Sequence, residues 1–188
     1  MKRQIAVAAL TAFISASAIA APKTYVMDPE HTFSRFSYDH LGLSKQILRF
    51  NKTTGTVILD KDAKKAEVNA IIDMKSIDTG TVLDEHMDAP DLLDMTKHPT
   101  ATFKSTKINF QGDKPASIEG DLTIKGITKP ITLTVTSFYN GPHPTLKKDA
   151  IGANALGTVK RSDFNAVKYL PVVGDEITID IALEAIAE

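Results

Sequence analysis

The sequence contains no cysteine among its 188 residues. Without cysteine the chain can form neither a disulfide framework nor the lipid-modified cysteine that anchors some exported proteins. We therefore expect an exported form of this chain to be free and soluble.

An excess of charge of one sign is also lacking. Lysine and arginine number 22 against 23 aspartates and glutamates, for a formal net charge of −1, and no long basic run occurs. A nucleic-acid-binding protein needs a basic face that neutralises phosphates. The composition excludes nucleic acids and other polyanions as expected partners.

Residues 1–20 have the order of a secretory signal peptide. A basic start, an apolar run over 5–14 and the small residues Ala18-Ile19-Ala20 follow one another. An uncleaved membrane anchor is the alternative, but the run is shorter than the ~20 apolar residues that span a bilayer. We expect cleavage after Ala20, no integral membrane span, and one domain over residues 21–188.

Polar and apolar residues alternate through most of the chain. In "GDLTIKGITKPITLTVTSF", Leu122 and Ile124 share one face of a strand, and Ile131, Leu133 and Val135 share one face of the next. Turns that bear Gly, Asn, Asp or Pro separate about eight such segments. They are residues 32–40, 47–60, 66–74, 100–110, 117–125, 131–138, 150–160 and 176–185.

Strands that are apolar on one face can pair into a sandwich or close into a barrel. Short connections favour a barrel, and the small residues Ala153, Ala155 and Gly157 on one face would leave space inside it. An eight-stranded barrel is either filled by its own side chains or wide enough for one small ligand. We predict an all-β fold, an eight-stranded antiparallel barrel.

The segment 81–99 departs from the alternation. Pro90, with Asp88 near a capping position, is typical of a helix start, and it would place Leu92, Leu93 and Met95 inward. We expect a short helical segment near residues 82–95 that closes one end of the barrel.

A barrel that spans the outer membrane is a rival interpretation. Such barrels present an apolar band to lipid, bordered by aromatic girdles. Here tryptophan is absent, and the second face of nearly every strand carries Thr, Lys, Asp or Glu. The pattern indicates an apolar interior and a polar exterior.

Motifs for catalysis or metal binding are missing. The five histidines form no His-x-His or His-x-x-x-His pair, and there is no Gly-x-Ser-x-Gly elbow or glycine-rich phosphate loop. The acidic cluster of residues 84–94 lacks calcium-loop spacing, and we interpret it as a solvated helix face. We predict no catalytic residue and no metal site, although a triad assembled from distant segments would leave no motif.

The inward strand positions are the candidate ligand contacts. Aromatic residues there are core first and pocket lining second, and the sequence does not separate these roles. His40 has two interpretations, a bond to a backbone carbonyl or a contact with a ligand's polar end. The predicted ligand-binding residues are Phe36, Tyr38, His40, Phe50, Ile72, Met74, Phe103, Leu122, Ile124, Ala153, Ala155, Val159 and Phe164.

Five segments resemble the YceI-like family in sequence and in order. They are "MDPEHTFSRFSYDHLG" (27–42), "SIDTG" (76–80), "DLLDMTKHPTATFKST" (91–106), "IEGDLTIKGITKPITL" (118–133) and "VKRSDFN" (159–165). The resemblance implies a lipocalin-like barrel that binds a long polyisoprenoid, such as a quinone or a polyprenyl phosphate, in an elongated tunnel. From it we expect a periplasmic binding or carrier protein with no cofactor besides that lipid, and a homodimer is open.

Three positions depart from the family pattern. Leu48 stands where a glycine is common and adds bulk near the wall; Leu83 replaces an arginine, so that residue's polar contact does not carry over. Asn165 replaces a glycine, a mild change because asparagine tolerates positive φ. These changes bear on pocket length and on the preferred head group.

Three alternatives to a carrier stay open. An enzyme acting on such a lipid needs titratable groups at the pocket mouth, where His40 with Asp39 or His98 is the candidate set. A broad scavenger of hydrophobic compounds would use the same interior. A pure interaction module would have a solid core.

Overall fold

Eleven strands of one antiparallel sheet make up most of the protein in a computed structural model that describes residues 21–188. The predicted signal peptide, residues 1–20, lies outside the described residues. In chain order the elements, including three 3₁₀ helices (η), are β1 (Lys23–Met27), β2 (Phe33–His40), β3 (Ser44–Phe50), β4 (Thr53–Asp60), β5 (Lys65–Asp73), η1 (Met74–Ser76), β6 (Ile77–Asp78), η2 (Glu85–Asp88), β7 (Thr100–Gln111), β8 (Lys114–Ile124), β9 (Ile127–Pro142), β10 (Asp149–Lys160), η3 (Arg161–Phe164) and β11 (Val173–Ala187).

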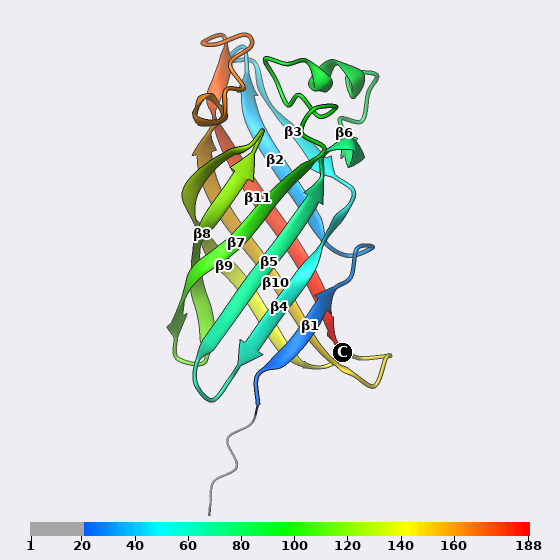
Figure 1. Cartoon of the computed structure of the whole chain (residues 1–188), viewed down its shortest axis with the longest axis vertical. Helices are drawn as coiled ribbons and strands as arrows, with labels where there is room; N and C mark the ends of the chain where they lie inside the picture. The colour runs from blue at the N-terminus through cyan, green and yellow to red at the C-terminus, as the bar shows by residue number, and fades with distance from the viewer. Residues whose placement is uncertain (1–20) are drawn as a thin grey trace, which may run out of the picture.

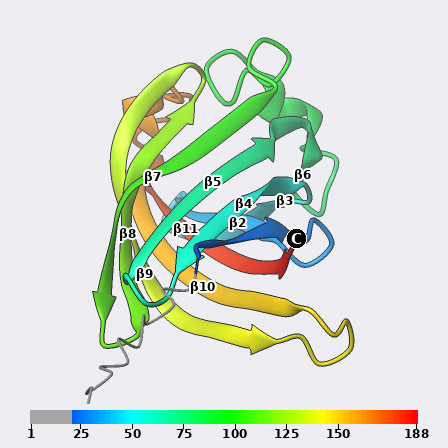
Figure 2. The same cartoon turned by 60° about the horizontal axis from the view of Figure 1, so that its bottom comes forward.

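The sheet closes on itself because β1 pairs with two strands at once. Tyr25 lies opposite Val57 of β4 on one side and opposite Ala187 of β11 on the other. The closed ring runs β1-β4-β5-β7-β8-β9-β10-β11, and Figure 2 shows β1 between β4 and β11. The predicted eight-stranded antiparallel barrel is confirmed.

β11 pairs with two different strands along the same edge. Its last residues, Ala185 to Ala187, pair with β1, whereas residues from Val173 to Ala182 pair with β2. β2 and β3 therefore continue the wall beyond β1, toward the top of Figure 1. From β7 to β11 neighbouring strands follow chain order, as expected for an up-and-down barrel.

The structure divides the predicted strands differently in a few places. The segment 47–60 forms two strands, β3 and β4, separated by Asn51 and Lys52. The alternation misses β1 and β6, because five and two residues are too few to show a period of two clearly.

The alternating stretch 120–138 forms most of the hairpin of β8 and β9. Ile124 pairs with Ile127, and between them Lys125 and Gly126 have φ angles of 53° and 74°. Two central residues with positive φ make a type I′ turn, whose twist matches that of the strands it joins. Glycine adopts this conformation without strain, which explains its place in the turn.

A buried cluster fills the lower end of the barrel. Tyr25 is 3% exposed, and its hydroxyl accepts a hydrogen bond from Asn140 Nδ2 at 2.9 Å. The other buried members are Met27, Val57, Leu59, Ile151, Ala185 and Ala187. The cluster includes residues of β1, β4 and β11, so the strands that close the ring also help to seal its lower end.

Two irregular segments, residues 79–98 and 165–172, lie at the upper end of the barrel (green and orange in Figure 1). Lys125, in the β8–β9 turn, joins them. Its Nζ donates to the carbonyl oxygens of Pro90 and Asn165 at 2.7 and 2.8 Å. Burial of this ammonium lowers the pKa of Lys125, with Asp94 and Asp91 opposing the effect.

The same two segments also contact each other directly. The Lys168 backbone N–H donates to the Asp91 carbonyl at 3.0 Å, and its Nζ lies 3.3 Å from the Asp91 carboxylate. The rings of His86 and Tyr169 stack with centroids 5.9 Å apart. These contacts hold the two segments together at the upper end of the barrel.

The short helical segment expected near residues 82–95 is present as η2, a single 3₁₀ turn that ends before Pro90. Pro90 does not begin a helix, because the Asp88 carboxylate bonds the backbone N–H and hydroxyl of Thr96, at 2.7 and 2.6 Å, and folds the chain back. Leu92 and Met95 are buried, as predicted. No helix within residues 21–188 is long and apolar enough to cross a bilayer.

Gly120 allows a large side chain to lie flat on the inner wall. A Cβ atom at Gly120 would stand 2.5 Å from Cζ of Phe103 and 2.6 Å from the carbonyl oxygen of Lys104. The ring could turn away, but the backbone oxygen is fixed by the sheet. Glycine at this position therefore lets the Phe103 ring pack against β8.

We expect Gly120→Ala to lower the free energy of unfolding by about 1 to 3 kcal/mol, because the added methyl overpacks the wall. Urea unfolding followed by circular dichroism measures this loss. Gly152→Ala is the matched control, since the nearest atom to its Cβ is Tyr139 Cβ at 3.8 Å, an ordinary contact. Equal stability of the two variants would contradict the proposed packing.

Candidate ligand-binding site

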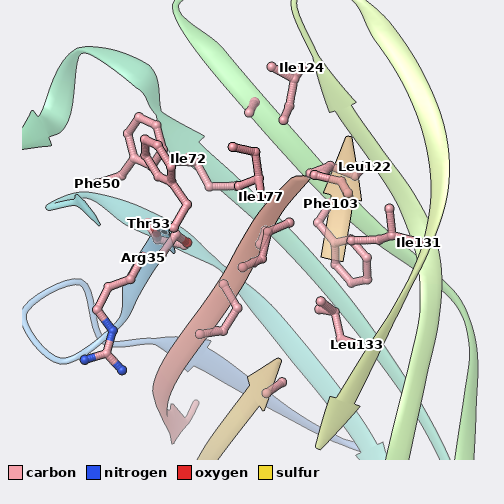
Figure 3. Close-up of a pocket in the computed structure, with 18 of the residues that line it drawn as sticks. Arg35, Phe50, Thr53, Ile72, Phe103, Leu122, Ile124, Ile131, Leu133 and Ile177 are labelled. Atoms are coloured by element: carbon pink, nitrogen blue, oxygen red, sulfur yellow. Dashed lines mark hydrogen bonds between the residues drawn. The ribbon is translucent and has the colours of Figure 1, made fainter. Parts of the chain in front are cut away.

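The inward side chains of the barrel enclose a cavity of about 570 Å³. Pockets that hold small ligands range from about 300 to 1,000 Å³. Aliphatic and aromatic side chains from every strand of the ring line this cavity. Figure 3 shows Phe103, Leu122 and Leu133, from three successive strands, among the residues that project into it.

All thirteen residues that the sequence predicts as ligand contacts line this one cavity. Eleven belong to strands, Met74 belongs to η1, and Phe164 belongs to η3. Each strand residue among them lies at the inward phase of the alternation. The structure therefore brings the predicted set together, whereas their contact with a ligand stays a prediction.

Of the three small residues on the inner face of β10, Ala153 and Ala155 line the cavity, whereas the Leu133 side chain packs over Gly157. Ala155 is buried in a cluster with Phe103, Leu133 and Phe164. Ala153, two residues earlier, lines the cavity outside that cluster and is only partly buried. A side chain larger than methyl at Ala153 would project into the open part of the cavity.

The departures from the family pattern lie where they affect the wall. Leu48 is buried and lines the cavity, which agrees with the expected added bulk. Leu83 lies at the upper end, where it lines the cavity and is also half exposed. Asn165 has φ 56° and ψ 30°, the left-handed conformation that asparagine tolerates.

Polar side chains that line the cavity include a group at its upper end. Tyr38 and His40 follow each other on the inner face of β2, with ring centroids 6.5 Å apart. Burial raises the pKa of the Tyr38 phenol, and the nearby Arg161 charge opposes that effect. A ligand's polar end can reach hydrogen-bonding groups here.

Within residues 21–188, no hydrogen bond joins the His40 ring to a backbone carbonyl. Neither its ring nor the Tyr38 hydroxyl has a hydrogen-bond partner among residues 21–188. Of the two interpretations of His40, the backbone-bonded one is therefore wrong within the described chain. Contact of His40 with a ligand remains a prediction.

Arg161 is a buried cation that no motif in the sequence marks. Its Nε, Nη1 and Nη2 donate to the carbonyl oxygens of Gly174, Ala166 and Val173 at 2.8, 2.6 and 3.0 Å. Burial lowers the pKa of Arg161, opposed by the charges of Asp175 and Tyr38. The alternation of β10 could have indicated it, because the inward positions of Ala155 and Val159 continue, in steps of two, to position 161.

Other cavity residues come from the irregular upper segments, where no alternation marks them. They include Thr79, Thr81, His86 and Tyr169. Arg35 also borders the cavity, but Figure 3 shows its side chain turned away, and it pairs with Asp180 at 3.0 Å. The upper segments therefore add polar groups that only the tertiary structure reveals.

The groups considered for catalysis do not converge at the cavity. Neither Asp39 nor His98 lines it. Asp39 accepts a hydrogen bond from the Gly42 backbone N–H at 2.8 Å, and His98 lies 3.9 Å from Asp94. His40 has neither candidate partner beside it on the cavity wall.

Only Glu85 and Asp88 of the acidic cluster of residues 84–94 lie in η2, so the cluster is not the face of one helix, contrary to our interpretation. Asp84 accepts from the Thr79 backbone N–H, and Asp88 and Asp91 have separate partners described above. These carboxylates organise the turns of the upper segment. Over residues 21–188, no three metal-ligating side chains gather.

Arg161→Met should open the segment 165–174. Removing the guanidinium leaves three carbonyl oxygens without their donor, which we expect to cost at least about 2 kcal/mol of unfolding free energy. Hydrogen exchange of the amides in this segment should rise, as read by mass spectrometry. Arg49→Met, which breaks an exposed pair with Asp78, is the control, and equal exchange in both variants would contradict the assigned role.

Asp175 holds the start of η3 in place. Its carboxylate accepts from the Ser162 backbone N–H at 2.9 Å and from the Ser162 hydroxyl at 2.8 Å. Burial alone would raise the pKa of Asp175, but these hydrogen bonds and the Arg161 charge outweigh it and hold the pKa below its usual value. Ionised Asp175 therefore stabilises the fold.

We expect Asp175→Asn to flatten the loss of stability in acid. Because the folded-state pKa lies below the usual 3.8, the contribution is complete above that value and is lost as pH falls through the lower folded-state pKa. Urea midpoints measured from about pH 5 down to pH 3 test this. Asp113→Asn, at an exposed pair with Lys64, should keep the wild-type slope; a wild-type slope in Asp175→Asn would refute the assignment.

Comparisons with known proteins agree with this geometry. A family model described as the YceI-like domain matches residues 25–185. Protein YceI of Shigella flexneri is 35% identical over 178 residues, which cover 94% of this chain and 92% of that protein.

Two solved structures are similar in fold. Burkholderia cenocepacia BcnA has a TM-score of 0.71 and 24% identity, covering 85% of this chain and 99% of that chain. A polyisoprenoid binding domain from Saccharophagus degradans has a TM-score of 0.65 and 16% identity, covering 87% and 98%. Taken with the match of the family model over nearly the whole barrel, the chain belongs to the YceI-like family.

Proposed function

We propose that this protein is a periplasmic carrier that holds the tail of an isoprenoid lipid, a quinone or a polyprenyl phosphate, inside the barrel. The observation that carries the proposal is the apolar cavity, lined by inward side chains of every strand of the ring. Membership of the YceI-like family supports it. So does the fold shared with a polyisoprenoid binding domain.

The apolar wall accounts for affinity without a charged anchor. Each buried methylene is worth ~0.8 kcal/mol, so one five-carbon unit contributes roughly 3 to 4 kcal/mol before ordering costs. A few buried units then reach micromolar binding, about −8 kcal/mol. Leu83, in place of the family's arginine, agrees with an affinity that comes mainly from the tail.

The head group belongs at the upper end in this proposal. Tyr38 and His40 offer hydrogen-bonding groups that the protein leaves unused within residues 21–188, and the buried Arg161 adds positive potential nearby. A quinone carbonyl would accept a hydrogen bond from these groups. A phosphate would also gain from the Arg161 charge, so the identity of the bound lipid decides between the two.

Binding is preferred to catalysis because of the composition of the wall. Within the described chain no aspartate or glutamate lines the cavity, so the histidines on its wall, His40 and His86, have no carboxylate partner there. An enzyme acting on a head group would need a positioned acid or base within hydrogen-bond reach of the reacting atoms. Export to the periplasm rests on the predicted signal peptide.

Protein purified from its own periplasm should retain an isoprenoid lipid, seen by native mass spectrometry and identified after solvent extraction. Ala153→Phe fills the open part of the cavity and should lower the bound fraction or the affinity at least about tenfold while the barrel stays folded. Thr158→Phe, on the exposed outer side of the same strand, should bind as the wild type does.

Three outcomes would count against the proposal. An empty cavity in the native protein, or equal binding by Ala153→Phe and wild type, would remove the internal site. Turnover of a prenyl phosphate beyond one equivalent would favour an enzyme. Displacement of a quinone by unrelated hydrophobic compounds at similar concentrations would favour a broad scavenger.

A further inference from the structure

Exposed apolar side chains gather at the upper end of the barrel. Thirteen large hydrophobic residues within 21–188 are exposed, and seven of them lie in three short segments at this end. Val82 is 94% exposed, Leu43 81% and Val172 60%. We call this set the apolar rim: Leu41, Leu43, Val82, Leu83, Val167, Tyr169 and Val172.

The three segments of the rim surround one end of the barrel. They are the β2–β3 turn, the segment 79–98 and the segment 165–172, which Figure 1 shows together at the top. The Leu41 backbone N–H donates to the Val172 carbonyl at 3.1 Å, and Tyr169 stacks on His86. The rim is therefore a connected surface built from distant parts of the chain.

The rim residues are held outward by well-bonded turns. The Asp39 carboxylate accepts from the Gly42 backbone N–H at 2.8 Å, beside Leu41 and Leu43. The Asp84 carboxylate accepts from the Thr79 backbone N–H at 2.9 Å, next to Val82 and Leu83. These bonds fix the backbone of both turns beside the exposed apolar side chains.

The rim is continuous with the cavity. Leu83 and Tyr169 belong to both, since each is about half exposed and also lines the cavity. The lower end, in contrast, is filled by the buried cluster around Tyr25. A molecule that moves between the cavity and its surroundings would pass the rim.

We propose that the apolar rim docks the upper end of the barrel on the surface of a phospholipid bilayer, where the cavity takes up or releases its lipid. This inference rests on the proposed function, because an isoprenoid lipid resides in membranes. Exposed Leu and Val tips with an adjoining Tyr suit the boundary between head groups and acyl chains.

A bilayer fits the rim better than a folded protein partner. The apolar tips stand on three separate segments, and the polar residues Ser44 and Lys168 adjoin them in the sequence. A fluid interface accepts separate protrusions, whereas a protein interface needs close complementarity of shape. Single aliphatic side chains can each insert among lipids.

The charges near the rim predict which bilayer it prefers. Lys45 and Lys168 lie beside the tips, but so do Asp39, Asp84 and Glu85. Without a cationic excess, attraction to anionic lipids adds little. Docking should therefore occur on zwitterionic vesicles and persist at high salt.

Flotation of the mature chain, residues 21–188, with vesicles of equal parts phosphatidylcholine and phosphatidylethanolamine tests the proposal. The wild type should float with the vesicles at low and high salt. The triple variant Leu43→Ser, Val82→Ser, Val172→Ser should partition about tenfold less, since three apolar tips are lost. The control, Ile71→Thr, Leu146→Ser, Leu156→Thr, changes three exposed apolar residues outside the rim and should float as the wild type does.

Isoprenoid binding in detergent solution, measured on the same proteins, separates this inference from the proposed function. Lipid binding without flotation overturns docking and leaves the carrier role intact. Flotation that depends on the rim, without isoprenoid binding, supports docking and overturns the carrier role. Equal losses in rim and control variants, or flotation lost at high salt, overturn docking by the rim. Rim-dependent dimers in sedimentation velocity without flotation would assign the rim to a second copy instead.

Discussion

Closure of the sheet by β1 is the constraint on which the rest of the structure depends. Four residues of β1 pair with β4 on one side and three pair with the end of β11 on the other, so that no strand of the ring has a free edge at the lower end. Once the sheet is closed, one face of every strand must point into the barrel. Once the backbone groups bond each other in the wall, the interior needs only apolar side chains, and their sizes decide how much of it stays open.

The fold class and the cavity lining could be predicted from the sequence, because inward and outward residues alternate along every strand of a barrel. Leu122, Ile124 and Leu133 show a period of two that survives folding unchanged, so fold class and cavity lining follow from local pattern. The helix expected at Pro90 fails for a different reason. The Thr96 backbone N–H instead donates to the Asp88 carboxylate, eight residues earlier, and folds the chain back. No local preference in the sequence indicates such a loop closure.

The candidate site likewise has one part that the sequence predicts, the cavity wall, and one part that it does not, the upper end. Its wall is encoded strand by strand, whereas its upper end is assembled by contacts such as Lys125 with Pro90 and Asn165, which lie 35 and 40 residues away. Arg161 lies between these two cases. The alternation places residue 161 on the inner face, but only the three carbonyl oxygens that accept from its guanidinium explain why a cation is stable there. Residues whose surroundings come from distant segments are the ones that sequence patterns miss.

The buried cluster around Tyr25 gives the tube a blind end. A linear molecule in a blind tube enters and leaves by one route, so the part that goes in first comes out last. An isoprenoid entering by its tail would keep its head at the exit throughout, and any chain longer than the tube would protrude there. Depth, rather than width, would then set how much of the chain is shielded from water.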